Sequence, residues 1–314
     1  MSPAAGRSGK DTDMGYSFRK AQEFIYRNAR PLGMALWQHH FENKGAQGVL
    51  RALAFYQNAD GGFGHALEAD CWNPGSSPIQ TWSAAEILRG MGYFNHKYPL
   101  VGSMLAYLSG GSDFDGHLWR DTVPGNNDHP HAPWWTYPTD ADYNPTASLA
   151  GLLVRAAPKG SGAETLGLRL AGEAVGFFLR GEALQQHTLA CFVQLYEYLA
   201  GSGAAEAFPM REFAEKLREA VSEGITRDTG KWATDYVYKP SFFIGGKNSP
   251  YYEDNRKLAE YECEFIKDTQ LEDGSWSVNW AWGAYPEQWP VARNWWKADI
   301  ILKNLLYLKG MEKL

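Results

Sequence analysis

A short turn pattern that recurs along the chain constrains the fold more than any other feature. An Asp is followed at once, or after one residue, by a Gly, and an aromatic residue comes within three positions of that Gly; the pattern begins at Asp60, Asp115, Asp228 and Asp273. The spacings of 55, 113 and 45 residues fit a degenerate unit of about 50 residues, one copy of which has lost the pattern. Gly readily takes the left-handed conformation that ends a helix, and Asp bonds nearby amides. We therefore expect each turn to end a helix, with its ring pinned to the body of the protein.

Most of the chain between these turns has the 3.6-residue periodicity of amphipathic helices. No stretch shows sustained alternation of apolar and polar residues, so the sequence predicts an all-α fold. The expected helices are Tyr16–Arg27, Ala46–Gln57, Ile79–Met91, Tyr98–Leu108, Pro145–Ala157, Glu164–Leu179, Leu184–Leu199, Arg211–Ser222, Tyr252–Thr269 and Trp295–Leu308. Paired helices that repeat in this way form either a closed ring or a solenoid. With five or six units and no polar capping repeat, we expect closure into a ring.

Charge and cysteine content narrow the class of protein. A net charge of -6 and an isoelectric point near 5.8 argue against a nucleic-acid surface. No apolar run approaches the length of a membrane span. Residues 1–14 are polar and predict a disordered leader, followed by a single domain over residues 15–314. The three cysteines are far apart and lack a CxxC motif, which favours a reducing compartment and predicts a cytoplasmic location.

Two of the turns carry a family resemblance. Gln270-Leu271-Glu272-Asp273-Gly274-Ser275-Trp276 resembles the QW motif (QxxDGxW) of triterpene cyclases. The segment from Gln57 to Phe63 is similar to the corresponding repeat in protein prenyltransferase β subunits and squalene–hopene-type cyclases. The resemblance covers residues 45–90 and 255–312 well and the middle of the chain loosely. It implies an α/α toroid of inner and outer helices around a central apolar cavity, here as a single-domain member of the terpenoid cyclase and prenyltransferase superfamily.

The same resemblance suggests a catalytic pair. Asp140-Ala141-Asp142 resembles the start of the DxDDTA motif of class II terpene cyclases, and Thr146-Ala147 resembles its end. It implies that Asp142 is the acid that protonates an alkene and that Asp140 supports it. Tyr143 replaces the last Asp of the motif, and Asn144-Pro145 is inserted before Thr146. In the alternative interpretation, Asp142 only decorates a helix start, with Asn144 as the N-cap.

Aromatic residues in loops are the candidates for the substrate pocket. The chain has 13 Trp, 17 Tyr and 15 Phe, and aromatic faces can hold a carbocation by cation–π attraction of about 0.5–2 kcal/mol each. The predicted substrate-binding residues are His131, Trp134, Trp135, Tyr137, Tyr143, Trp280, Trp282 and Tyr285. Trp295 and Trp296 are expected to pack helix against helix instead. His131 is also a candidate for orienting Asp142.

No metal or cofactor is predicted, except Mg²⁺ if the substrate carries a diphosphate. The His129-Pro130-His131 segment offers metal-ligand side chains, but hydrogen-bonded loop histidines are the preferred interpretation. Protein prenyltransferases bind zinc partly through a DxC pattern, whereas Asp70 and Cys71 are adjacent here. Protein prenylation is therefore disfavoured.

Three functions stay open at this point. The first is a class II-like terpenoid cyclase that acts on a linear isoprenoid. The second is a carbohydrate-active toroid, a glycosidase or lyase, in which Glu68 or Asp70 supplies an alternative acid or base; simple solvation of these two loop carboxylates is the competing interpretation. The third is a non-catalytic binding relative. The expected partner is a small apolar molecule rather than a nucleic acid, while peripheral membrane contact and oligomeric state stay open.

Overall fold

The fold is all-helical over the part of the chain that the structure describes. The structure is a computed structural model that describes residues 16–314, and the predicted leader, residues 1–14, lies outside that range. Within it there are eleven α-helices, five short 3₁₀ turns and no β-strand. The helices are α1 (Phe18–Asn28), α2 (Pro31–Phe41), α3 (Gln47–Ala54), α4 (Pro78–Gly90), α5 (Pro99–Ser109), α6 (Tyr143–Ala156), α7 (Gly162–Leu179), α8 (Gln186–Ala200), α9 (Met210–Gly224), α10 (Tyr252–Asp268) and α11 (Gln288–Gly310). This confirms the predicted fold class.

All ten predicted helices are present, and one further helix, α2, was not predicted. Its sequence, Pro31-Leu-Gly-Met-Ala-Leu-Trp-Gln-His-His-Phe, has apolar side chains around much of its circumference rather than on one stripe. The helix contacts α1, α3 and α11, so several of its sides face protein. A helix enclosed on several sides has no simple amphipathic signal for periodicity to detect.

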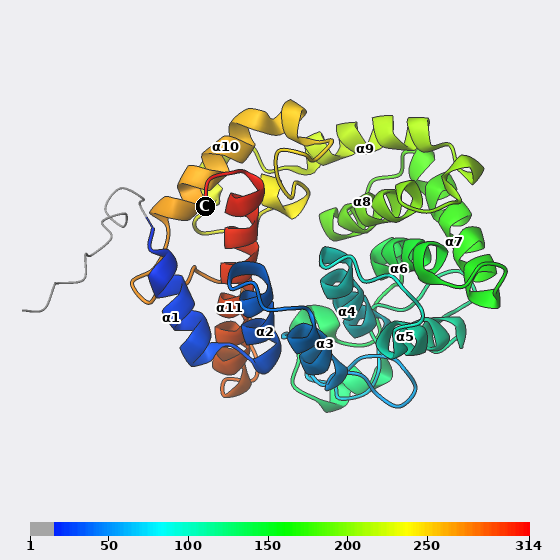
Figure 1. Ribbon diagram of the computed structural model, residues 1–314, viewed down its shortest axis with the longest axis horizontal. Coiled ribbons are helices and arrows are strands. Elements are labelled where there is room, and N and C mark those ends of the chain that lie inside the picture. The colour runs from blue at the N-terminus through cyan, green and yellow to red at the C-terminus, as the bar shows by residue number, and fades with distance from the viewer. Residues whose placement is uncertain (1–15) are drawn as a thin grey trace, which may run out of the picture.

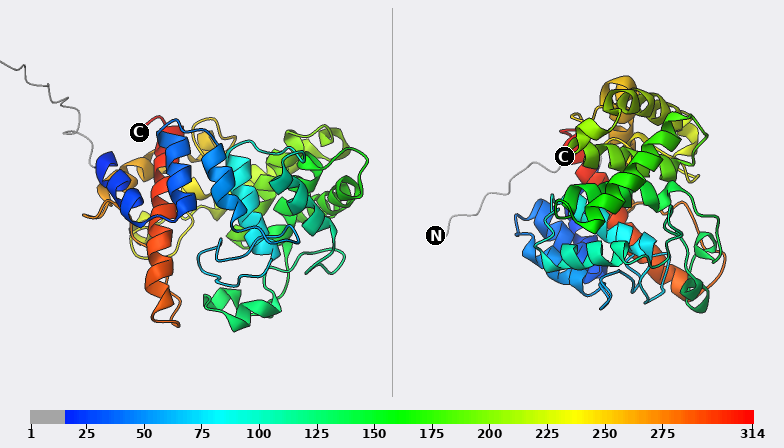
Figure 2. Two further views of the ribbon diagram at one scale, coloured as in Figure 1. Left: turned by 60° about the horizontal axis from the view of Figure 1, so that its bottom comes forward. Right: turned by 90° about the vertical axis from the view of Figure 1, so that its right-hand side faces the viewer.

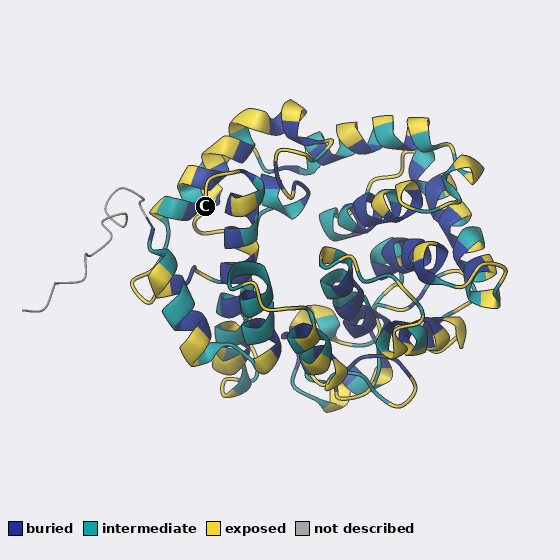
Figure 3. Cartoon of the chain, viewed as in Figure 1, coloured by how far each residue is buried: buried dark blue, intermediate teal, exposed yellow. Residues whose placement is uncertain are grey.

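The helices follow one another around the molecule in chain order (Figure 1). Helices α4, α6 and α8 lie towards the centre of that view and α5, α7 and α9 at its periphery, with α11 and α2 on the opposite side. Helix α6 contacts both α4 and α8. On the opposite side, α11 contacts α2. The buried faces of the helices point towards their neighbours, whereas exposed residues gather on outer turns and loops (Figure 3).

Two of the turns are each bonded by one glutamine to the next helix at the periphery of the molecule. Gln57 Nε2 donates to the carbonyl of Gly61 at 2.9 Å and to that of Leu100, in the first turn of α5, at 2.9 Å. Gln270 repeats this arrangement: its Nε2 donates to the carbonyls of Gly274 (3.0 Å) and Ser17 (3.1 Å), and its Oε1 accepts from Ser17 N (2.7 Å). Ser17 is the N-cap of α1, so the last turn of the chain is bound to the first helix.

Gly274 shows why these turns require glycine. It has φ +89°, and a Cβ atom built on it would lie 2.3 Å from the backbone of Lys20 in α1. The corresponding Gly61 has φ +91°, and its Cβ would lie 2.1 Å from the carbonyl oxygen of Ser103 in α5. Both turns therefore pack directly against the backbone of the following outer helix, as equivalent units of a repeat do.

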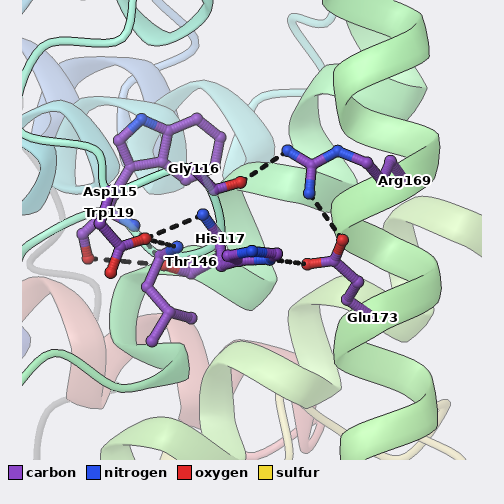
Figure 4. A network of polar contacts seen from close by, with 8 residues as sticks. Asp115, Gly116, His117, Trp119, Thr146, Arg169 and Glu173 are labelled. Atoms are coloured by element: carbon purple, nitrogen blue, oxygen red, sulfur yellow. Dashed lines mark hydrogen bonds and ion pairs between the residues drawn. The ribbon is translucent and has the colours of Figure 1, made fainter.

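The Asp115 turn is also bonded to the next helix at the periphery, α7, but through different residues (Figure 4). Arg169 on α7 donates to the carbonyl of Gly116 at 2.7 Å and pairs with Glu173 at 2.6 Å. Glu173 in turn lies 3.0 Å from Nδ1 of His117. An arginine from the next outer helix thus replaces the glutamine. The aromatic anchors of all four turns, Phe63, Trp119, Trp232 and Trp276, are buried as predicted.

The loops that precede α4, α6 and α11 converge at one side of the molecule. In Figure 2 the loops before α4 and α6 lie on the same side as the N-terminal end of α11. These loops carry most of the residues singled out in the sequence. Among residues 16–314, no helix is long and apolar enough to span a membrane.

Candidate functional site

A buried carboxylate, Asp70, is held by three tryptophans. It lies in the loop between α3 and α4 and is 2% exposed. Its Oδ1 accepts from the indole N–H of Trp282 at 2.8 Å and of Trp296 at 2.6 Å, and its Oδ2 accepts from that of Trp280 at 3.0 Å. Trp280 and Trp282 belong to the loop before α11, and Trp296 lies on α11 itself. The loop between α3 and α4, the loop before α11 and α11 itself therefore meet at one carboxyl group.

Glu68 lies next to this carboxylate, and its pKa is raised. One oxygen, Oε2, accepts from the backbone N–H of Asp70 at 2.6 Å. Burial raises the pKa of Glu68 from its ordinary 4.5 to about 8, and the negative charge of Asp70 acts in the same direction. The residue as a whole is half-buried.

Both carboxyl groups have raised pKa values, and their hydrogen bonds differ. Burial also raises the pKa of Asp70, but the three indole N–H donors oppose that effect. An ionised carboxylate is an acceptor only, whereas a protonated one has to place its own hydrogen. Three donors point at Asp70 and only one backbone N–H at Glu68, so the hydrogen bonds favour protonation of Glu68 over protonation of Asp70.

A second charged pair borders Glu68. Arg30 donates to the carbonyls of Ala66 and, at 3.2 Å, Leu67, the two residues before Glu68. The guanidinium lies over the ring of Trp295 at 4.8 Å and 4.0 Å from the carboxylate of Asp299 on α11. Arg30 thus connects the backbone of the Glu68 loop to α11.

Aromatic side chains continue from the tryptophans to α8. Tyr236 packs edge-on against Trp280 at 5.5 Å, and Trp280 packs edge-on against Trp296 at 5.2 Å. The hydroxyl of Tyr236 lies 2.9 Å from Nε2 of His187. Burial raises the pKa of Tyr236, and the charges of Tyr238, Asp70 and Glu68 add to the rise. Tyr236 therefore faces the carboxylate pair, although 49% of its surface is exposed.

The predicted catalytic pair, Asp140 and Asp142, lies elsewhere, at the start of α6. Asp142 is the N-cap of that helix: its Oδ1 accepts from Asn144 N at 2.6 Å, and its Oδ2 accepts from the hydroxyl of Thr188 at 2.7 Å. Asp140 is exposed. Asn144 has a non-helical backbone (φ -96°, ψ 114°), so regular helical geometry begins at Pro145, directly after Asn144. Whether Asp142 is also an acid stays a prediction.

The remaining predicted pocket residues divide into two groups. The ring of Tyr285 lies 6.1 Å from that of Trp282 and 5.7 Å from that of His131, and Trp135 packs against the small cluster that contains Trp282. His131 bonds the His129 carbonyl (2.7 Å) and the Thr136 hydroxyl (3.1 Å) rather than Asp142. The others have different surroundings: Trp134 is 43% exposed, Tyr137 is bonded through its backbone to Asn127, and Tyr143 packs against Phe177 and Phe192.

Sequence reasoning missed four residues of the site: Arg30, Tyr236, Trp296 and Asp299. Trp296 was expected to serve helix packing alone. The available signal was on α11, where Trp295, Trp296, Asp299 and Lys303 follow one another at helical spacing in an otherwise apolar segment. Arg30 and Tyr236 carried no comparable pattern.

No metal-ligand cluster marks the site in the part of the chain that the structure describes. Among residues 16–314, no three His, Cys, Asp or Glu side chains are grouped as a metal site. Hollows of about 530 Å³ and 180 Å³ lie elsewhere, at residues 205–212 and between α4, α8 and residues 241–245.

The chain matches no protein-family model, and no similar curated protein or solved structure is found.

Proposed function

We propose that the helices form an α/α toroid of the terpenoid cyclase type. The support is the repeated bonding of Gln57 and Gln270 and the close approach of Gly61 and Gly274 to the next outer helix. Because the helix that follows the Gly274 turn in space is α1, the repeat unit returns to its start. That return is what closure of a single-domain ring requires.

We infer that the protein is an acid–base enzyme and that Glu68 is its proton donor. The observation that carries this inference is the position of the Glu68 carboxyl group beside Asp70, where burial and the charge of Asp70 raise its pKa to about 8. A carboxylic acid that stays neutral at pH 7 is available as a proton donor, but a raised pKa makes it a weaker acid, so protonation of a substrate atom depends on stabilisation of the cation that forms. The negative charge of Asp70 and the nearby rings then stabilise the cation that forms.

An apolar substrate suits this site best, and we propose a linear isoprenoid that is protonated at a carbon–carbon double bond and cyclised. The three indole N–H groups and both oxygens of Asp70 satisfy one another. Trp282 is buried, and the partly exposed Trp280 and Trp296 therefore present carbon atoms rather than hydrogen-bonding groups to a ligand. Cyclisation needs no metal, and Mg²⁺ enters only with a diphosphate substrate. Asp142, supported by Asp140, is the second candidate for the acid.

A carbohydrate-active enzyme is the second candidate function. It is favoured by the charged edge of the site, where Glu68, Arg30 and Asp299 come together. Two carboxyl groups beside aromatic rings also serve glycoside hydrolysis, with one as the acid and the other as nucleophile or base.

A substrate screen with three proteins tests the proposal. Wild type, Glu68→Gln and Asp142→Asn are incubated separately with linear prenyl diphosphates, linear polyenes and aryl glycosides, and products are identified by mass spectrometry. We expect cyclised products from wild type and Asp142→Asn, and a loss of about 10²–10⁴-fold in Glu68→Gln. Loss in Asp142→Asn alone would move the acid to Asp142. Hydrolysis of glycosides alone would support the second function, and full activity of Glu68→Gln would refute the role of Glu68.

A further inference from the structure

Asp299 shares a helix face with a residue that binds the carboxylate pair. It lies three residues after Trp296 on α11, and residues three apart are neighbours on a helix surface. Trp296 donates to Asp70, so this face of α11 lies towards Asp70 and Glu68. Asp299 keeps 29% of its side chain exposed, with the Arg30 guanidinium 4.0 Å away. The same arginine binds the backbone just before Glu68.

The two aspartates near Glu68 differ in how many hydrogen bonds their carboxylate oxygens already accept. Both oxygens of Asp70 accept hydrogen bonds from indoles, and its side chain is buried. Within residues 16–314, no hydrogen bond to the carboxylate of Asp299 is found. Asp299 therefore has oxygen lone pairs that are free to accept a proton, and Asp70 does not.

We infer that Asp299 is the proton-accepting carboxylate that works together with Glu68, an assignment that rests on the proposed function. Glu68 gives its proton to one alkene carbon, and the alkene π electrons form the new C–H bond. The neighbouring carbon becomes cationic, and ring closure moves the cation along the chain. A C–H bond beside the final cation then breaks, its electrons form a new double bond, and Asp299 takes the proton. Exchange with solvent returns a proton to Glu68, so the net reaction is an isomerisation.

The charges around Asp299 suit this role. Burial raises the pKa of Asp299, but the positive charges of Arg30 and Lys303 oppose the rise and favour the carboxylate. The negative charge of Asp299, like that of Asp70, also helps to keep the proton on Glu68. Glu68 thus has the environment that favours a neutral acid, and Asp299 has two nearby positive charges that favour its ionised form.

The test combines a proton measurement that needs no substrate with a turnover measurement. The infrared C=O band of the protonated Glu68 carboxyl is identified by its absence in Glu68→Gln and followed against pH in wild type, Asp299→Asn and Asp299→Glu. Asp268→Asn, a change of the same kind at the end of α10, is the matched control. Turnover is measured with the linear polyene or prenyl diphosphate that gives a product with wild type, and circular dichroism checks that each variant is folded.

We expect Asp299→Asn to shift the titration of the Glu68 band to lower pH and to lower turnover by about 10²–10⁴-fold. Asp299→Glu restores part of both, and Asp268→Asn changes neither. An unshifted Glu68 titration, or wild-type turnover in a folded Asp299→Asn, overturns the role of Asp299 and leaves the proposed function intact. Absence of the Glu68 band at pH 7, or full turnover in Glu68→Gln, overturns the proposed function itself.

Discussion

The raised pKa of Glu68 makes the free energy of unfolding depend on pH, and this dependence gives the sharpest prediction. An unfolded chain releases the Glu68 proton near pH 4.5, whereas the folded protein keeps it to about pH 8. Between these values the native state binds more protons than the unfolded state, so the free energy of unfolding falls as pH rises. Below pH 4.5 both states are protonated, and Glu68 contributes no pH dependence.

The size of the effect follows from the same two values. At about 1.4 kcal/mol per pH unit, the full difference corresponds to about 5 kcal/mol. Because the residue as a whole is half-buried and solvent screens part of the effect, we expect about 2–3 kcal/mol. The substitution Glu68→Gln removes the titratable group. The variant is therefore expected to gain stability relative to wild type as pH rises from 5 to 8.5.

Urea unfolding followed by tryptophan fluorescence measures this directly at a series of pH values. The matched control is Glu264→Gln, an exposed carboxylate on α10, which should show the pH dependence of wild type. If the stability difference between Glu68→Gln and wild type is the same at pH 5 and pH 8.5, Glu68 is not protonated in the folded protein. The proposed acid would then be wrong.

Three further predictions concern the frame that holds the site. Gly274→Ala should lower the free energy of unfolding by about 3 kcal/mol or more, because the new methyl group meets the α1 backbone at 2.3 Å. Its control is Gly283→Ala, which is also at positive φ but has no atom within 4 Å and should cost about 1 kcal/mol in the same urea assay. Gln270→Ala should cost about 1–3 kcal/mol and increase amide hydrogen exchange in α1, and unchanged exchange would contradict the closure contact. Asp142→Ala should lower stability by about 1 kcal/mol through loss of an N-cap, and no change in thermal unfolding would contradict that role.

The frame was predictable from sequence because its signals are local. A turn such as Gln270 to Trp276 contains its own Asp, Gly and ring, and its partners repeat at regular distances along the chain. Helix periodicity found every amphipathic helix for the same reason. It failed for α2, whose contacts on several sides leave no single apolar stripe.

The site was only partly predictable because its parts are far apart in sequence. Asp70 and Trp282 were both singled out, but for different purposes, and nothing in the sequence indicates that one binds the other across more than 200 residues. Asp142 was favoured over Glu68 because its DxD spacing resembles a known motif. What distinguishes Glu68 is burial beside a second carboxylate, and burial in a loop has no periodic signature.

The central claim, that the proton of Glu68 enters the product, is tested most directly by solvent deuterium. Wild type and Glu68→Gln are exchanged into D₂O and incubated with the linear polyene or prenyl diphosphate that wild type converts, and the product mass is recorded. The account predicts a cyclised product with one deuterium on carbon from wild type, and little or no product from Glu68→Gln. A cyclised product without deuterium, or a deuterated product formed equally well by Glu68→Gln, would contradict it.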